Sequence, residues 1–234
     1  MASALRSTSD ELARLRAQLD DVQGRRVRIP PLPTHPLIAD LLPDGGLRPG
    51  ETYAISGSMS LLLALLAPVS QAGSWAAVVG MPTLGAEAAH AHGVALDRLV
   101  LIPEPGTRWL AVTSAVAEVL PVVAVRPHGR AGDADISRLS ARLRDRGTVL
   151  LVQGAWPQAQ AMLSIEDPAW EGVGDGHGCL TRREVSVTVS SRRSPVPRTA
   201  RMLLPDVGGA LAAAPDQQQQ RRPRPHLVGL ERAG

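Results

Sequence analysis

Residues 55–66 read ISGSMSLLLALL, and this stretch decides how the chain folds. A predicted strand at residues 51–56 leads into it, a glycine follows, and the leucine run can form a helix. Nucleotide-binding proteins place their phosphate loop, G-x-x-x-x-G-K-[ST], at such a junction, because its backbone N–H groups, lysine and hydroxyl hold phosphate and Mg²⁺. Here leucines follow Gly57 where the lysine and the hydroxyl should stand. The stretch is therefore either a degenerate phosphate loop or an apolar helix that never bound phosphate.

The composition excludes several kinds of chemistry. The chain has 234 residues and a formal net charge of +3, and all 25 of its strongly basic residues are arginines. Because lysine is absent, a phosphate-loop lysine, a lysine Schiff base and a lysine general base are excluded. Cys179 is the single cysteine, which excludes a disulfide framework and a cysteine metal site within the chain.

Arginines are concentrated toward the C-terminal end of the sequence. Between Thr181 and Arg201, six arginines stand against one acidic residue, Glu184. Such a cluster suits nucleic-acid phosphates or an acidic partner surface. A solvated surface in an arginine-biased protein would carry the same pattern, so the charge alone does not choose between these interpretations.

The sequence gives no sign of a membrane location. The N-terminal residues MASALRSTSDELARLRAQLDD lack the apolar core of a signal peptide. The leucine-rich run at 61–66 is far too short to span a bilayer. We therefore expect a cytoplasmic protein with no membrane contact.

The chain divides into four predicted parts. Residues 1–28 contain an amphipathic helix with Leu12, Leu15 and Leu19 at coiled-coil spacing; it is too short to be stable alone and should dock on the core or on a partner. Residues 29–43, which include IPPLPTHP, are predicted to be an extended Pro-rich linker. Residues 44–208 form the core. Residues 209–234 are predicted to be a disordered basic tail.

Within the core, short apolar strands alternate with helices. Strands are predicted near 51–56, 75–79, 98–102, 121–126 and 148–153, and helices near 60–71, 83–92, 107–119 and 133–146. Continuously apolar strands between helices favour an α/β fold with a mostly parallel sheet and helices on both faces. After residue 155 the pattern of apolar and polar residues changes. In EVSVTVS at 184–190, valines alternate with polar residues with period two. An antiparallel C-terminal extension of the sheet is therefore predicted.

Two segments carry a resemblance to a known family. GGLRPGETYAISG at 45–57 is similar to the GGLPxGxxxEIxG segment that opens the RecA-like core, and HGVALDRLVLIPEP at 92–105 resembles a later segment of that core. The resemblance covers roughly residues 40–205. With its degenerate chemistry, the chain looks most like the ImuA proteins of bacterial mutasomes, in the truncated form of actinobacteria. The SulA-like division inhibitors are shorter relatives of the same fold.

The residues that RecA-like proteins use for ATP hydrolysis are missing. Between Gly57 and Gly73 the sequence is several residues shorter than such a protein needs. Gly80 stands where the water-activating acid is expected, and Arg126 where the Mg²⁺-linked Asp is expected. Phosphoryl transfer depends on positioning, metal and lysine electrostatics, so we expect no enzyme activity, no cofactor and no metal. The remnant of the phosphate loop is placed around Gly57, Ser58 and Ser60.

The resemblance implies a role in DNA-damage-induced mutagenesis and translesion synthesis, as part of the SOS response. The protein would act as an adaptor beside an ImuB-like Y-family protein and an error-prone DnaE-type polymerase, with RecA and DNA as further contacts, and would join the nucleoid when recruited. The alternatives are a SulA-like inhibitor of the tubulin-like division protein and an inactive RecA-like module that binds DNA.

Candidate contact residues lie in three regions. Partner-binding candidates are in the N-terminal helix and in the tail with its final HLVGLERAG: Leu12, Leu15, Leu19, Arg221, Arg222, Arg224, Leu227, Val228 and Leu230. DNA-contact candidates are Arg138 and Arg142, one turn apart on the helix at 133–146, together with Arg192 and Arg193. For the helix, a solvated face is the competing interpretation.

Overall fold

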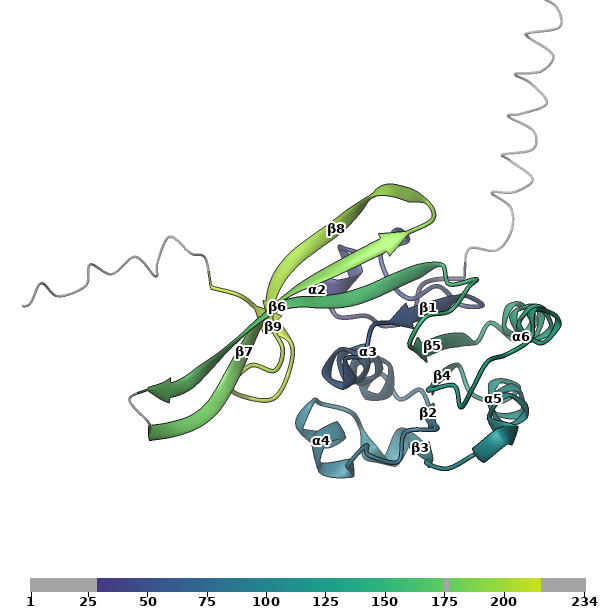
Figure 1. Ribbon diagram of the computed structural model, residues 1–234, viewed down its shortest axis with the longest axis horizontal. Coiled ribbons are helices and arrows are strands. Elements are labelled where there is room, and N and C mark those ends of the chain that lie inside the picture. The colour runs from purple at the N-terminus through teal and green to yellow at the C-terminus, as the bar shows by residue number, and fades with distance from the viewer. Residues whose placement is uncertain (1–28, 175–176, 216–234) are drawn as a thin grey trace, which may run out of the picture.

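Nine strands join in one sheet in the computed structural model, which describes residues 29–174 and 177–215 (Figure 1). Their order is β3-β2-β4-β5-β1-β6-β7-β8-β9. Neighbours from β3 to β6 pair in parallel, and those from β6 to β9 pair antiparallel. The bounds are β1 Thr52–Ile55, β2 Ala76–Val79, β3 Leu99–Ile102, β4 Val122–Val125, β5 Val149–Gln153, β6 Ala161–Gly174, β7 His177–Ser191, β8 Ser194–Leu203 and β9 Ala212–Ala213. The predicted α/β class and antiparallel extension are confirmed.

Helices cover both faces of the parallel part, as predicted. Helices α3 and α4 lie over one face, and α5 and α6 over the other (Figure 1). In α6 the sequence determines where the helix begins and ends. Asp133 and Asp135 complement the positive end of the helix dipole, and Gly147 ends the helix with φ +70°. The bounds are α2 Pro36–Ala39, α3 Met59–Gln71, α4 Ala86–Ala91, α5 Trp109–Ala117 and α6 Asp133–Arg146.

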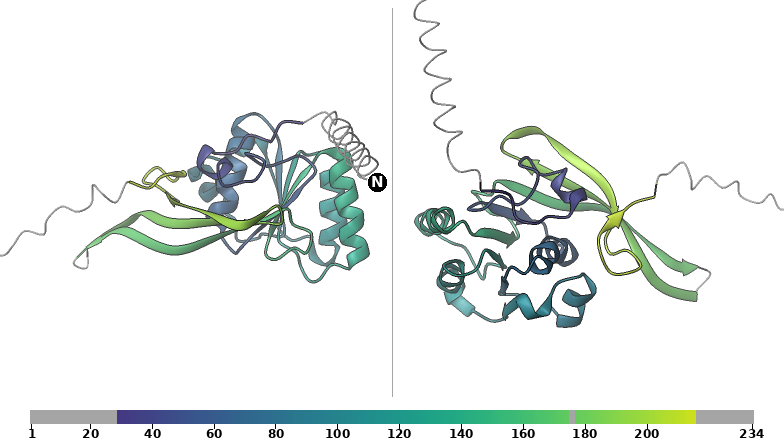
Figure 2. Two further views of the ribbon diagram at one scale, coloured as in Figure 1. Left: turned by 90° about the horizontal axis from the view of Figure 1, so that it is seen from above. Right: turned by 180° about the vertical axis from the view of Figure 1, so that it is seen from behind.

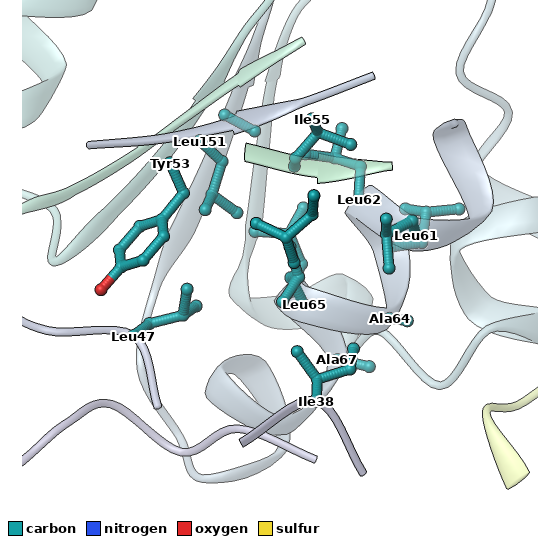
Figure 3. Close-up of a cluster of buried hydrophobic side chains, with 14 of the residues drawn as sticks. Ile38, Leu47, Tyr53, Ile55, Leu61, Leu62, Ala64, Leu65, Ala67 and Leu151 are labelled. Atoms are coloured by element: carbon teal, nitrogen blue, oxygen red, sulfur yellow. The ribbon is translucent and has the colours of Figure 1, made fainter. Parts of the chain in front are cut away.

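The helix α3 is buried on all sides. Every residue from Leu61 to Ala67 is buried, so no polar face remains. Leu62 and Leu65 lie against Ile55 of the sheet, and on the other side Ile38 of α2 packs near Ala67 (Figure 3). A helix that is apolar all round belongs in a core, which explains the leucine run at residues 61–66.

The antiparallel extension completes the enclosure of α3. Val185, Val187 and Val189 of β7 are buried in the same apolar cluster as α3, while Ser186 and Thr188 point to the other face of the sheet. The hairpin of β6 and β7 continues past the helical layers as a two-stranded arm (Figure 2). Alternating valines and hydroxyl residues thus give this part of the sheet one core face and one solvated face.

The predicted extended linker at 29–43 is wrong in its second half. Pro36 begins the helix α2, and the His35 ring accepts a hydrogen bond from the backbone N–H of Leu37. Ile38 and Leu42 are buried in the core. Proline at the first turn of a helix needs no backbone donor, so a Pro-rich segment can still open a helix where apolar residues follow.

The predicted tail also begins too early. Leu211 is buried, and β9 pairs with Met202 and Leu203 of β8. Residues 209–215 therefore belong to the folded core. The remainder of the predicted tail, like the N-terminal helix, lies outside the described residues. Among the residues that the structure describes, no helix has the length and apolar character needed to cross a bilayer.

Candidate functional site

The junction between β1 and α3 occupies the place of a phosphate loop and contains three residues. The backbone N–H of Ser56 donates to the carbonyl of Leu163 at 2.9 Å, and that of Gly57 donates to the carbonyl of Ile55 at 3.0 Å. Gly57 turns the chain with φ +64°, a conformation that favours glycine. Ser58 then caps α3, because its hydroxyl accepts the N–H of Leu61 at 3.2 Å. The candidate residues Gly57, Ser58 and Ser60 therefore form a tight turn and a helix start.

This junction is too short for a phosphate cradle. The phosphate-loop motif places four residues between its two glycines and follows them with lysine and a hydroxyl. Here one residue separates Gly57 from the first helical residue, Met59. Leu61 and Leu62 come next and are fully buried. A charged side chain at either position would be desolvated in the core, which is strongly unfavourable without a partner.

The position of the expected water-activating acid is closed to any side chain. Gly80 follows β2 with φ +77°, and a Cβ atom placed there would lie 2.6 Å from the carbonyl oxygen of Arg126. That distance is well inside van der Waals contact, and the oxygen belongs to the backbone. A carboxylate side chain at this position would therefore clash with the backbone of the residue after β4.

Arg126 replaces the expected metal-linked acid and is held by its neighbour strand. Its backbone N–H donates to the carbonyl of Val79 at 3.0 Å, and its side-chain Nε donates to Oε1 of Gln153 at 2.7 Å. A fixed guanidinium at this edge favours anions and repels a divalent cation. No cluster of three or more His, Cys, Asp or Glu side chains suited to a metal ion occurs within residues 29–174 and 177–215.

The six arginines of β7, of β8 and of the turn between them contact other residues of the same molecule. Arg182 pairs with Glu171 at 2.6 Å, and Arg201 pairs with Glu184 at 2.7 Å. Arg183 donates from Nε to the carbonyl of Leu204 at 2.7 Å and stacks over a tryptophan ring, and burial lowers the pKa of its guanidinium. The six arginines therefore brace the antiparallel extension, although four of them are exposed and the other two are half-buried. The other three contacts join Arg192 to the Pro157 carbonyl, Arg193 to Asp44 and Arg198 to the Asp40 carbonyl.

Each of the four DNA-contact candidates makes a contact within the same molecule. Arg138 pairs with Asp135 at 2.6 Å, and Arg142 pairs with Glu118 at 2.8 Å. Arg192 and Arg193 stand at the turn between β7 and β8. Each candidate thus has an internal partner, and the helix pair is separated in the chain from the turn pair. The partner-binding candidates in the N-terminal helix and the tail lie outside the described residues.

Sequence reasoning missed a cavity at the carboxyl ends of β4 and β5. Trp156 and Gln160, in the segment between β5 and β6, line it together with residues of the loop after β4. A tryptophan and a glutamine in a short loop after a buried strand were its signal in the sequence. Their significance depends on contacts with β1, α6 and β7, which spacing along the chain does not reveal.

Comparison with known proteins extends this description. Residues 40–158 match the family described as the MT3502 N-terminal domain. The chain belongs to that family. The match runs from the end of α2 to the loop before β6, so the MT3502 N-terminal domain corresponds here to the parallel strands β1 to β5 and their helices. The chain is also 38% identical over 136 residues to the uncharacterized protein Rv3395c of Mycobacterium tuberculosis. The aligned region covers 56% of this chain and 67% of that protein.

Proposed function

We propose that this protein is a non-catalytic RecA-like adaptor of the ImuA type found in actinobacteria. It supports error-prone translesion synthesis during the response to DNA damage through contacts with an ImuB-like Y-family protein. The observation that carries the proposal is the three-residue junction between β1 and α3, which leaves no room for a phosphate cradle. The fold is kept while the elements that would bind nucleotide are replaced by core packing, as an interaction scaffold requires.

Two further positions support a scaffold without catalysis. Gly80 has no space for a carboxylate, and Arg126 places a positive charge where a metal-linked acid would stand. Transition-state stabilisation in phosphoryl transfer comes mainly from lysine, metal and positioning. A chain that lacks the lysine and presents an arginine in this place is poorly suited to that reaction.

The internal arginine pairs favour an adaptor over a DNA-binding module. A phosphate-binding surface needs guanidinium groups that are free to replace counterions. Arg138, Arg142 and Arg193 already pair with carboxylates of this protein, although these pairs are solvent-exposed and individually weak. Protein contacts with an ImuB-like protein, and through it with a DnaE-type polymerase, RecA and DNA, therefore fit these side chains better than direct phosphate binding does.

The proposal is tested with the purified full chain and a purified ImuB-like protein. We expect a complex on size-exclusion chromatography that survives high salt, because apolar docking depends far less on ionic strength than phosphate contacts do. Two shortened chains, one starting at Ile29 and one ending at Pro215, then locate the contact. Loss of binding in the first assigns it to the segment with Leu12, Leu15 and Leu19, and loss in the second assigns it to the tail candidates.

The same samples separate the competing functions. A complex with the tubulin-like division protein, and none with the ImuB-like protein, would replace the adaptor proposal by a division inhibitor. Binding of duplex DNA that falls steeply with salt, without a protein complex, would favour the DNA-binding module. Mg²⁺-dependent ATP hydrolysis by the pure protein would contradict a non-catalytic scaffold.

A further inference from the structure

A cavity of about 660 Å³ lies on the face of the sheet opposite α3. Its walls come from three places: the loop after β4, the segment between β5 and β6, and the adjoining ends of β6 and β7. The first turn of α6 closes one side, at Asp133 and Ile136. The volume is that of ordinary small-molecule sites. Open α/β sheets bind ligands at the carboxyl ends of their parallel strands, and residues that follow β4 and β5 line this cavity.

The interior of the cavity is mainly apolar. Ala54, Ile136 and Trp156 contribute from the cluster that underlies α5 and α6. Met162 also lines it and is 38% exposed. An apolar side chain is unusual on this face of the sheet. Ser190 of β7 pairs with Met162, and the other outward residues of β7 nearby also carry hydroxyl groups. An exposed flexible thioether beside a cavity offers adaptable contact to an apolar ligand.

Two arginines supply positive charge at the cavity. Arg130 is exposed, and it makes no ion pair or side-chain hydrogen bond with any residue that the structure describes. Arg192 comes from the turn after β7, and its contact with the Pro157 carbonyl holds it at the wall. Asp133 is the single carboxylate among the lining residues and sits at the start of α6, where it complements the helix dipole. The net charge of the residues that line the cavity is therefore positive.

Two buried side chains of the lining have unused hydrogen-bond donors. Trp156 is 8% exposed and Gln160 is 9% exposed, and neither the indole Nε1 nor the amide Nε2 has a hydrogen-bond partner within residues 29–174 and 177–215. The backbone of Gln160 is fully engaged: its N–H donates to Thr52 at 2.7 Å and its carbonyl accepts from the hydroxyl of Ser191 at 3.2 Å. A buried donor without a partner costs about 1–3 kcal/mol. Both unused groups are donors, so an acceptor group on a ligand complements them.

We propose that this cavity binds a small amphipathic anion, an aromatic or branched apolar body that carries a carboxylate or phosphate group. The apolar body occupies the space between Trp156, Ile136 and Met162. The anionic group lies toward Arg130 and Arg192, and it accepts hydrogen bonds from the unused donors of Trp156 and Gln160, which line the same cavity. This site is independent of the proposed adaptor function, because it uses the face of the sheet opposite α3 and requires no partner protein.

The test uses the full chain and two acids, naphthoate and phenylbutyrate, each beside its neutral primary amide of the same shape. The readout is the indole N–H region of a two-dimensional nitrogen–proton NMR spectrum, to which each of the four tryptophans contributes one signal. We expect the Trp156 signal to shift and saturate with at least one acid. The corresponding amide should bind about tenfold or more weakly, because hydrogen bonds to a charged group contribute about 1.5–3 kcal/mol.

Matched variants decide whether the cavity is responsible. Arg130→Gln should weaken binding of the acid by about tenfold while leaving that of the amide unchanged. Arg138→Gln is the control, because this exposed arginine lies on the neighbouring helix but does not line the cavity. Met162→Trp changes an exposed residue and should block both ligands by filling the space.

Three results would overturn the proposal. The first is the absence of a saturable shift at Trp156 with either acid. The second is equal affinity for acid and amide, and the third is equal weakening by Arg130→Gln and Arg138→Gln, which would reduce the effect to surface charge. The adaptor function would stand in each case, because its own test measures a protein complex.

Discussion

Tyr53 is the only tyrosine of the chain, and it reports on the core beside the β1–α3 junction. Its ring is 1% exposed and packs near Leu47 (Figure 3), and its hydroxyl oxygen accepts the backbone N–H of Arg48 at 2.8 Å. Burial raises the pKa of Tyr53 to about 12, against the smaller opposing effect of the hydrogen bond from Arg48. Ionisation of this group should therefore require partial opening of the core.

The raised pKa makes stability depend on pH in one direction. Because the folded state holds the proton more tightly than the unfolded state, the contribution of Tyr53 is complete below about pH 10 and is lost as pH rises from there toward 12. We expect the phenolate absorbance of the native protein to rise with a midpoint near 12. Tyr53→Phe should remove this signal and the associated alkaline loss of stability. A midpoint near that of free tyrosine would show that the ring is solvated.

Gly80 is the second residue whose role can be measured. Gly80→Ala must accept both a positive φ and the contact of its Cβ with the carbonyl of Arg126, and we expect it to lower the free energy of unfolding by about 2–3 kcal/mol. Gly73→Ala is the matched control, because Gly73 has a similar φ of +85° and nothing within 4 Å of the added carbon. It should cost about 1 kcal/mol. Urea unfolding of both variants measures the difference, and equal losses would mean that the contact at Gly80 relaxes freely.

At the scale of elements, the strands and helices of the parallel part follow from local sequence. Five short apolar runs became β1 to β5, and the amphipathic pattern of residues 133–146 became α6 with the same bounds. These elements are predictable because burial on both faces demands continuous apolar strands, and burial on one face demands a helical stripe. The helix α2 was missed because its four residues owe their conformation to the burial of Ile38, which no local pattern records.

The candidate site could be predicted from the sequence only where its features are local. The degenerate junction could be inferred from the missing lysine and the short spacing after Gly57, since both are local properties of the chain. The pairing of Arg193 with Asp44 could not, because 149 positions separate the two residues. The cavity beside Trp156 was missed for the same reason, as its lining comes from β1, α6 and β7 at once. Sequence thus indicates what a site lacks more readily than which distant side chains meet.

At the scale of the whole molecule, α3 is enclosed by elements from opposite ends of the chain. Ile38 of α2 precedes the parallel strands, while Val187 of β7 and Met202 of β8 follow them, and all three join the same apolar cluster. The family match ends before β6. The antiparallel extension is therefore part of the core that stabilises the MT3502 N-terminal domain in this protein, and removing it should expose α3.

The end of that extension sets a boundary that can be tested by truncation. A chain ending at Gly208 loses β9 and the buried side chain of Leu211, and it loses the hydrogen bond from Ala210 N–H to the Asp206 carboxylate at 2.8 Å. We expect its free energy of unfolding in urea to fall by about 2–4 kcal/mol, mainly from the lost apolar burial of Leu211 and the exposed end of β8. A chain ending at Pro215 keeps every one of these contacts and should unfold like the full chain.

The two truncations also determine how partner binding is to be interpreted. If the shorter chain lost both stability and an ImuB-like partner, the loss of binding would reflect a damaged sheet edge, since β8 would lack its neighbour at Met202 and Leu203. If the chain ending at Pro215 remained stable and lost the partner, the contact would lie in residues 216–234. Equal destabilisation of both truncated chains would contradict the boundary, because it would show that residues after Pro215 contribute to the fold.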